Sequence, residues 1–304
     1  MAVACLMAVA GGCSSPEGSS STTHSSTPDV TDKMTALLGP IIEHEGGRFS
    51  GVEISRSTGT PWMTNSAGKE TTQITFGPDT QLENVSSQPR HYRDRPSVDP
   101  KDFDLDDYLA KVSETSKSCG EGQYWSVSAE VISSTASIVT QRCGMTDQGS
   151  SFLNRQPIAP ITNVWSLEGL TTIWNEMLTF APKGYVRDIG IKNSNVTILF
   201  ATEYPPTPCA VGYYRSWGDQ KLPAAHVFDA HCTYDASAVS TNKVNLNAYT
   251  AEEIWARAQE LAQEKNIHFD EETTLSLSTD TSEHTVLTLI EADKGGFIYL
   301  DNPQ

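Results

Sequence analysis

Two histidines and an aspartate lie close together in the segment from His226 to Cys232. Imidazole and carboxylate groups bind zinc and act as general acids and bases, so His226, Asp229 and His231 are the best candidates for such chemistry. In an extended strand, however, Asp229 and His231 point to one face and His226 to the other. A single metal ion could therefore contact all three side chains only if the strand contained a bulge or turn. We expect a polar strand here, and we assign no catalytic residue, metal ligand or cofactor.

The rest of the sequence contains none of the compact catalytic motifs. It has no Gly-x-Ser-x-Gly elbow, no His-Glu-x-x-His pair, no phosphate-binding loop and no dinucleotide fingerprint. We therefore expect a non-catalytic binding or interaction module. The alternative is an extracytoplasmic hydrolase or metal-assisted enzyme whose site residues are dispersed along the chain.

The aromatic strand that follows a proline-stiffened loop is a candidate binding surface. The loop covers residues 204–209 and is followed by Tyr213, Tyr214, Arg215 and Trp217. Tyr, Trp and Arg supply much of the binding energy at protein interfaces. Because side chains alternate along a strand, Tyr213, Arg215 and Trp217 are predicted on a partner-binding face and Tyr214 on the core face.

A basic island interrupts the acidic sequence between Pro89 and Pro96. It contains Arg90 and Arg93 on either side of His91 and Tyr92. Arginine pairs bind phosphate groups through two hydrogen bonds, so this island is a weaker candidate for contact with lipid headgroups or an anionic wall polymer. The alternative is an ordinary solvated loop.

Four cysteines in the body of the chain suggest an oxidising compartment. Two local disulfides, Cys119 to Cys143 and Cys209 to Cys232, would each close a loop of about two dozen residues, worth about 3 kcal/mol. Four cysteines allow three connectivities, and a four-cysteine zinc site is a weaker possibility because no Cys-x-x-Cys pair is present.

Cys13 follows a short apolar run that ends in small residues, from Leu6 to Gly12. This pattern resembles the signal of bacterial lipoproteins, of the Gram-positive or actinobacterial type. The resemblance implies cleavage before Cys13 and a diacylglyceryl group on its sulfur. Ala10 stands where that family prefers leucine, and residues 1–12 contain no Lys or Arg, so we expect the true start codon to lie upstream.

The segment after Cys13 is rich in serine and threonine. Such a segment buries too little apolar surface to fold, so we predict a signal peptide over residues 1–12 and a flexible tether over 13–29. Two acyl chains anchor a protein stably to a membrane. The implied location is extracytoplasmic, with the membrane as one partner and an envelope protein, wall polymer or lipid as another.

The chain of 304 residues has a net charge of −17 and a pI near 4.7. A strongly negative net charge disfavours the binding of polyanions, so we exclude nucleic acid as a partner. The length suggests two domains once the tether is removed.

Hydrophobic spacing predicts helices in residues 30–42 and after the capping residues Asp104, Ser166 and Thr250, the last with a capping box to Glu253. Alternating segments predict strands at 48–54 and 71–76, and hairpins at 124–143, 185–200 and 274–300. Helices followed by tight hairpins indicate an α+β fold, because parallel strands would need a helix between them.

The order of helices and hairpins occurs twice along the chain. We therefore predict two tandem similar α+β domains, at 30–157 and 161–304, each with helices packed on one face of an antiparallel sheet. The proline-containing segment 155–160 is the expected linker.

Overall fold

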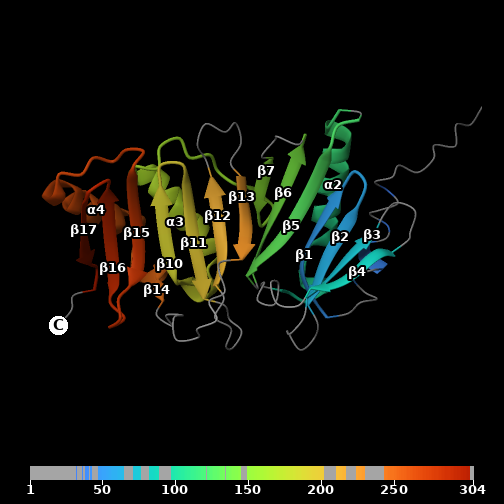
Figure 1. The fold of residues 1–304 in the computed structure, drawn as a ribbon, viewed down its shortest axis with the longest axis horizontal. Coiled ribbons are helices and arrows are strands. Elements are labelled where there is room, and N and C mark those ends of the chain that lie inside the picture. The colour runs from blue at the N-terminus through green and yellow to red at the C-terminus, as the bar shows by residue number, and fades with distance from the viewer. Residues whose placement is uncertain are drawn as a thin grey trace, which may run out of the picture.

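The computed structural model describes residues 32, 36, 38–40, 42, 47–64, 71–76, 82–88, 97–120, 122–133, 135–144, 149–201, 210–216, 224–229 and 243–301. For β4 and β13, and for β3 apart from Thr75, it describes the backbone only. The described chain is sheet-rich, has few helices and is built on two large antiparallel sheets (Figure 1).

The first sheet has eight strands in the order β4-β3-β2-β1-β5-β6-β7-β8. Its strands are β1 (Arg48–Ser55), β2 (Gly59–Thr64), β3 (Thr71–Phe76), β4 (Leu82–Gln88), β5 (Trp125–Ser133), β6 (Ala136–Cys143), β7 (Ser150–Leu153) and β8 (Gln156–Pro157). The hairpin predicted at 124–143 is confirmed as β5 and β6.

The second sheet has seven strands in the order β13-β12-β11-β10-β15-β16-β17. They are β10 (Asp188–Lys192), β11 (Asn195–Ala201), β12 (Ala210–Ser216), β13 (Ala224–Asp229), β15 (Thr273–Thr279), β16 (Thr285–Glu291) and β17 (Lys294–Tyr299). A separate pair joins β9 (Tyr185–Val186) to β14 (Val244–Asn245). The hairpins predicted in this half are confirmed as β10–β11 and β15–β16.

The helices begin at the residues that the sequence predicts. They are α2 (Leu105–Ser118), α3 (Leu167–Phe180) and α4 (Ala251–Lys265), with short 3-10 helices η1 (Pro100–Asp102), η2 (Pro182–Gly184) and η4 (Leu246–Ala248). Asp104, Ser166 and Thr250 each accept a hydrogen bond from a backbone N–H of the first turn. The described residues of the predicted first helix are helical too. None of the described helices combines the length and the apolar composition that crossing a membrane requires.

The capping box of α4 gives a direct stability prediction. Thr250 accepts from the N–H of Glu253, and the Glu253 carboxylate accepts from the N–H of Thr250 at 2.8 Å. We expect Thr250→Ala to lower the free energy of unfolding by about 1 kcal/mol, because one N–H of the first turn loses its acceptor. Urea unfolding would measure this loss, and Thr250→Ser, which keeps the acceptor, should lose far less.

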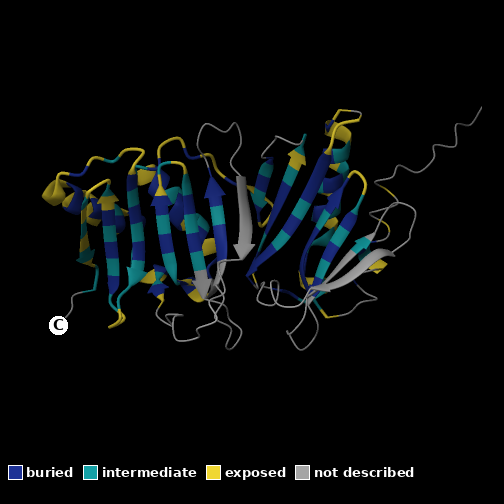
Figure 2. Cartoon of the chain, in the orientation of Figure 1, coloured by how far each residue is buried: buried dark blue, intermediate teal, exposed yellow. Residues whose placement is uncertain are grey.

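Helices cover one face of each sheet. In Figure 1, α2 lies behind the first sheet, and α3 and α4 lie behind the second. Figure 2 shows buried residues alternating with partly exposed ones along the strands of the second sheet. The Tyr108 hydroxyl of α2 donates a hydrogen bond of 2.9 Å to the Val127 carbonyl of β5, which fixes the helix to its sheet.

The two halves share part of one core. Val139 of β6 faces the α2 side, so its neighbour Ile138 points to the opposite face. On that opposite face, Ile138 and Leu153 join Ile158 and Ile161 in the core of the second sheet. Strand β13 lies against β5, β6 and β7. Within the predicted linker 155–160, Ile158 is buried in this shared core, and the other five residues are exposed.

Candidate functional site

A buried polar cluster joins helix α3 to strand β12. The Tyr213 hydroxyl donates to Glu176 Oε1, and Arg215 Nη1 forms an ion pair with Glu176 Oε2. Arg215 Nη2 donates to the carbonyl oxygen of Ala159, just after β8. The side chains of Arg215 and Glu176 are 0% and 10% exposed. The cluster thus ties together α3, β12 and the segment between the two sheets.

This cluster corrects the predicted binding face. Tyr213 and Arg215 were expected to face a partner, but both are 0% exposed, while Tyr214, expected in the core, is half-buried on the opposite face. The reason is that α3 and the segment after β8 cover the Arg215 face. Alternation shows which residues share a face, but not which face other elements cover.

Burial controls the protonation of this cluster. Burial raises the pKa of Glu176, and this effect outweighs the opposing attraction of the Arg215 guanidinium and the hydrogen bond from Tyr213. Burial also raises the pKa of Tyr213 well above its ordinary value, and the neighbouring Glu176 adds to the shift. Because both carboxylate oxygens of Glu176 already accept bonds from inside the protein, we assign the cluster a structural role.

A polar-rimmed cavity of about 240 Å³ lies in the first half, between η1, the start of α2 and the turns of the hairpins β5–β6 and β7–β8. Its apolar lining is Val98, Phe103, Val131, Ala136 and Val139, and its polar lining is Asp102, Asp104, Asp107, Ser133, Thr135, Ser137, Asn154 and Arg155.

Several polar groups of this cavity already bind one another. Arg155 pairs with Asp104, whose carboxylate also accepts from the Asp107 N–H at the start of α2. The Asn154 side chain accepts from the Ser137 N–H and donates to the Thr135 carbonyl. These bonds hold two turns and a helix start together, so we interpret the cavity as a seam in the fold. Within the described ranges, no three His, Cys, Asp or Glu side chains form a group that could hold a metal ion.

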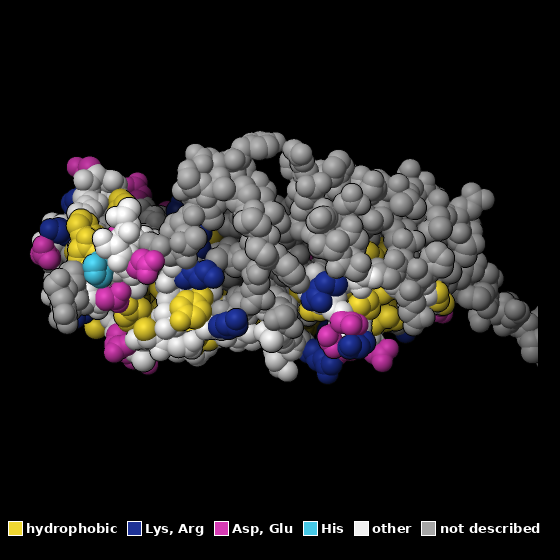
Figure 3. All heavy atoms as spheres, turned by 90° about the horizontal axis from the view of Figure 1, so that it is seen from below, with side chains coloured by type: hydrophobic (Ala, Val, Ile, Leu, Met, Phe, Trp, Pro, Cys, Tyr) yellow, Lys and Arg dark blue, Asp and Glu magenta, His cyan; other side chains and the backbone are white. Residues whose placement is uncertain are grey.

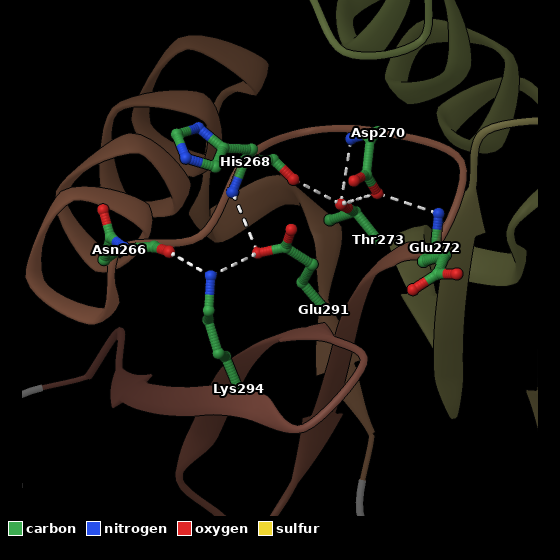
Figure 4. Close-up of polar contacts among 7 residues, drawn as sticks. All are labelled: Asn266, His268, Asp270, Glu272, Thr273, Glu291 and Lys294. Atoms are coloured by element: carbon green, nitrogen blue, oxygen red, sulfur yellow. Dashed lines mark hydrogen bonds and ion pairs between the residues drawn. The ribbon is translucent and has the colours of Figure 1, made fainter.

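A second polar cluster fixes the end of α4 to the last strands (Figure 4). Glu291 Oε2 accepts from the backbone N–H of His268 and lies 3.6 Å from Lys294 Nζ. Lys294 Nζ donates to the carbonyl of Asn266, which ends α4 in a left-handed conformation with φ of 51°. A cation at this position satisfies a free carbonyl at the helix end. The contacts therefore support helix α4.

The loop beside this cluster is organised around Asp270. Its carboxylate accepts from the backbone N–H of Glu272 and from the hydroxyl of Thr273, and these bonds lower the pKa of Asp270. The Thr273 hydroxyl also donates to the His268 carbonyl at 2.7 Å. All of these groups serve the turn into β15, so this loop too is structural.

One face of the second sheet points away from α3 and α4 and is called here the open face. On β10 and β15–β17 it consists of Asp188, Gly190, Lys192, Thr274, Ser276, Ser278, Val286, Thr288, Ile290, Gly295, Phe297 and Tyr299. Phe297, Ile290 and Tyr299 are 59%, 45% and 39% exposed. A Cβ built on Gly190 meets no described atom within 4 Å, so there is free space above this strand.

The sequence did not identify the exposed aromatic residues of β17. The signal was present, because Phe297 and Tyr299 are two residues apart in a strand whose intervening Ile298 packs against the core. The sequence does not show that the face of Phe297 and Tyr299 is one that no described helix covers. A large exposed apolar side chain is informative when it belongs to a contiguous surface.

The charged surface has no single sign on the side drawn in Figure 3. Acidic and basic side chains of the described residues lie near one another at the left of that view and again right of its centre. Interleaved charges produce a weaker local field than the net charge of −17 suggests.

The other predicted site residues fall outside the described structure. Cys13, Arg90, Arg93, Cys209, Trp217, His231 and Cys232 lie beyond the described residues, and so do the signal peptide and tether. His226 and Asp229 belong to β13, of which only the backbone is described. A disulfide does join Cys119 to Cys143, as expected, with their Cα atoms 5.7 Å apart.

Comparisons with known proteins leave the family open. No protein-family model matches the chain, and its sequence matches no curated protein. Among solved structures, the Proliferating Cellular Nuclear Antigen from Entamoeba histolytica aligns with 87% of this chain and 94% of its own, at 9% sequence identity and a TM-score of 0.19. A TM-score this low supports no conclusion about fold or function.

Proposed function

We propose that this chain is a lipid-anchored envelope lipoprotein that acts as a non-catalytic binding module through the open face of its second sheet. The observation that carries the proposal is the open face itself. It presents three apolar side chains that are 39–59% exposed beside a strip of small polar residues. Contiguous exposed apolar surface in a soluble domain is typical of interaction sites.

The buried charges favour binding over catalysis. Glu176 and Arg215 are the most deeply buried ion pair of the described chain, and they bind each other and the backbone. A catalytic acid or base needs a titratable group that can reach a substrate. The open face on β10 and β15–β17 carries three titratable side chains, Asp188, Lys192 and Tyr299, and the Asp188 carboxylate lies 3.1 Å from Arg187 Nε. Its hydroxyl and aromatic groups are better suited to holding a ligand than to transforming one.

The proposed architecture extends the fold of the described residues to the whole chain. A signal peptide over residues 1–12 and a tether over 13–29 would precede two tandem similar domains at 30–157 and 161–304. Two antiparallel sheets, each with helices on one side, support this arrangement. The lipid on Cys13 would place both domains outside the cytoplasm, with the membrane as one partner.

Cys13→Ala is expected to release the protein from membranes, because the residue that would carry both acyl chains is lost. The measurement is fractionation of cells whose walls have been digested, with the protein expressed from its full-length gene. The parent should sediment with the membranes and the variant should remain in the supernatant. Membrane binding equal to that of the parent would show that the lipid-anchor proposal is wrong.

The open face can be tested separately from the anchor. The Cys13→Ala protein should still sediment with isolated cell envelopes that retain their wall, and the added changes Phe297→Ala and Tyr299→Ala should abolish this. Tyr124→Ala is the matched control, because Tyr124 is 42% exposed but lies outside the open face. Equal sedimentation of the open-face variant and the control would refute a binding role for this surface.

A further inference from the structure

We infer that the ligand of the open face is a neutral polysaccharide. This inference rests on the proposed function and specifies its ligand. It starts from one row of side chains that crosses six strands. Pairing between neighbouring strands aligns Phe297 with Thr288, Thr288 with Ser276, Ser276 with Gly190, Gly190 with Thr197, and Thr197 with Tyr214.

The row has the length and shape of an extended binding strip. Neighbouring strands lie about 4.8 Å apart, so its five spacings span roughly 24 Å. Among the described side chains of the row the two outermost are aromatic, Phe297 at 59% exposure and Tyr214 half-buried; next to Tyr214 the register continues to His226 of β13, of which only the backbone is described. Between them the side chains are short, and Gly190 leaves free space above the central strand. A long, flat ligand could therefore lie across the strands without meeting a bulky side chain of this row.

The polar groups of the strip match a polyhydroxylated ligand. Thr288, Ser276 and Thr197 each present a hydroxyl, and Thr274 and Ser278 flank the row on β15. A hydroxyl both donates and accepts hydrogen bonds, so a row of hydroxyls can pair with the hydroxyls of a sugar chain in either sense. Charged ligands would gain less from such groups, because charge-assisted bonds need an ionised partner.

The charge of the open face points the same way. Of its twelve positions on β10 and β15–β17, one is acidic and one is basic, Asp188 and Lys192, so their charges cancel. The whole chain carries −17. A polyanion would be repelled by the protein, and a polycation would find no cluster of carboxylates on this face. A neutral polymer is the electrostatic complement of this surface.

The aromatic edge supplies the apolar contact. The rings of Phe297 and Tyr299 have centroids 5.7 Å apart and planes at 85°. Only one of the two rings can therefore lie parallel to a flat ligand, and the more exposed Phe297 is suited to this role. Tyr299 would flank it with an apolar ring and a polar hydroxyl. The C–H surface of a sugar ring can pack on Phe297 while the sugar hydroxyls reach the strip.

Electrophoresis of the full chain through native gels that contain a polysaccharide tests the inference. The probes are dextran, arabinogalactan and hydroxyethyl cellulose, which are neutral, and dextran sulfate, which is anionic. We expect slower migration in at least one neutral gel, and a polysaccharide concentration for half-retardation at least tenfold higher for Phe297→Ala/Tyr299→Ala. Tyr124→Ala should match the parent.

A second variant blocks the strip without removing an aromatic residue. Ser276→Trp places a large ring in the middle of the row. It should raise the polysaccharide concentration for half-retardation at least tenfold, and the midpoint of urea unfolding should be unchanged. Since Ser276 lies on the partly exposed side of β15, the core-facing Leu275 and Leu277 are untouched. If Ser276→Trp unfolds the protein, the double aromatic variant alone decides the matter.

Four results would overturn the inference. The first three are the absence of retardation in every neutral gel, equal retardation of the parent and both open-face variants, and stronger retardation by dextran sulfate than by any of the neutral polysaccharides. The fourth is a dimer in sedimentation velocity that Phe297→Ala/Tyr299→Ala dissociates, because a second copy would then occupy the face. The protein could sediment with envelopes in a manner that depends on Phe297 and Tyr299 and yet show no retardation by any neutral polysaccharide. This result would leave the proposed function intact and refute only the inference that the ligand is a neutral polysaccharide.

Discussion

Replacing Arg215 with alanine is expected to lower the free energy of unfolding by about 3–5 kcal/mol, as for other buried ion pairs that lose one partner. The variant leaves the Glu176 carboxylate, 10% exposed, without its cation. It also removes the donor to the carbonyl oxygen of Ala159. Urea unfolding at pH 7 measures the effect directly.

The control for this prediction is an ion pair at the surface. Arg257 Nη1 lies 2.8 Å from Glu260 Oε2 on α4, and the two side chains are 53% and 63% exposed. Arg257→Ala should change the free energy of unfolding by no more than about 0.5 kcal/mol. A loss below about 1 kcal/mol for Arg215→Ala would show that the buried cluster contributes little to stability.

A compensating variant separates lost attraction from stranded charge. Arg215→Met/Glu176→Leu removes both charges and keeps apolar volume between α3 and β12. Replacing a buried ion pair by apolar side chains is often neutral or stabilising. We therefore expect the double variant to recover most of the stability that Arg215→Ala loses. In both Arg215→Ala and the double variant, backbone hydrogen exchange near Ala159 should be faster than in the parent, because neither variant retains the Arg215 donor to the Ala159 carbonyl.

Local signals predicted the helices and hairpins well. Asp104, Ser166 and Thr250 cap helices in the structure because capping depends on a few neighbouring residues and on the backbone of one turn. The hairpins were predictable for a similar reason, because alternation and a short turn lie within one segment.

Long-range packing was not predictable from the same signals. Tyr213 and Arg215 share a face, as alternation requires, but the element that covers this face comes from residues 159–180. Likewise, Ile138 and Ile158 enter the core of the second sheet although they precede it in sequence. Nothing in either local pattern specifies a contact across the two halves. The expected interface was therefore misplaced, because the local pattern does not show which elements cover the Tyr213 and Arg215 face.

The open face illustrates how the sequence can still help once the fold is known. Phe297 and Tyr299 alternate with Ile298 whether or not a helix covers them. Only the position of α3 and α4 on the other side of the sheet turns that alternation into an exposed aromatic edge. Side-chain periodicity defines the faces, and tertiary packing decides which face is available to a partner.

Removing the disulfide between Cys119 and Cys143 is expected to lower the free energy of unfolding by about 3 kcal/mol, the chain-entropy value for a loop of this size. The two cysteines are 24 positions apart, and Cys119 ends α2 while Cys143 ends β6. Without the bond the unfolded chain gains conformations, and the end of α2 loses its covalent attachment to the sheet. The variant is Cys119→Ser/Cys143→Ser, measured by urea unfolding.

Reduction of the parent protein supplies the matched comparison. Dithiothreitol should lower the stability of the parent by at least as much as the double substitution does, because it also opens any bond between Cys209 and Cys232. Non-reducing peptide mapping of the double variant should still recover Cys209 linked to Cys232. Cys119 is 7% exposed and belongs to the core between α2 and the first sheet. Unchanged stability of the variant would mean that this packing already holds the segment that the bond restrains. Helix α2 also lies against β5, the strand that pairs with β6. Unchanged stability would therefore mean that this packing, and not the disulfide, holds α2 to the sheet.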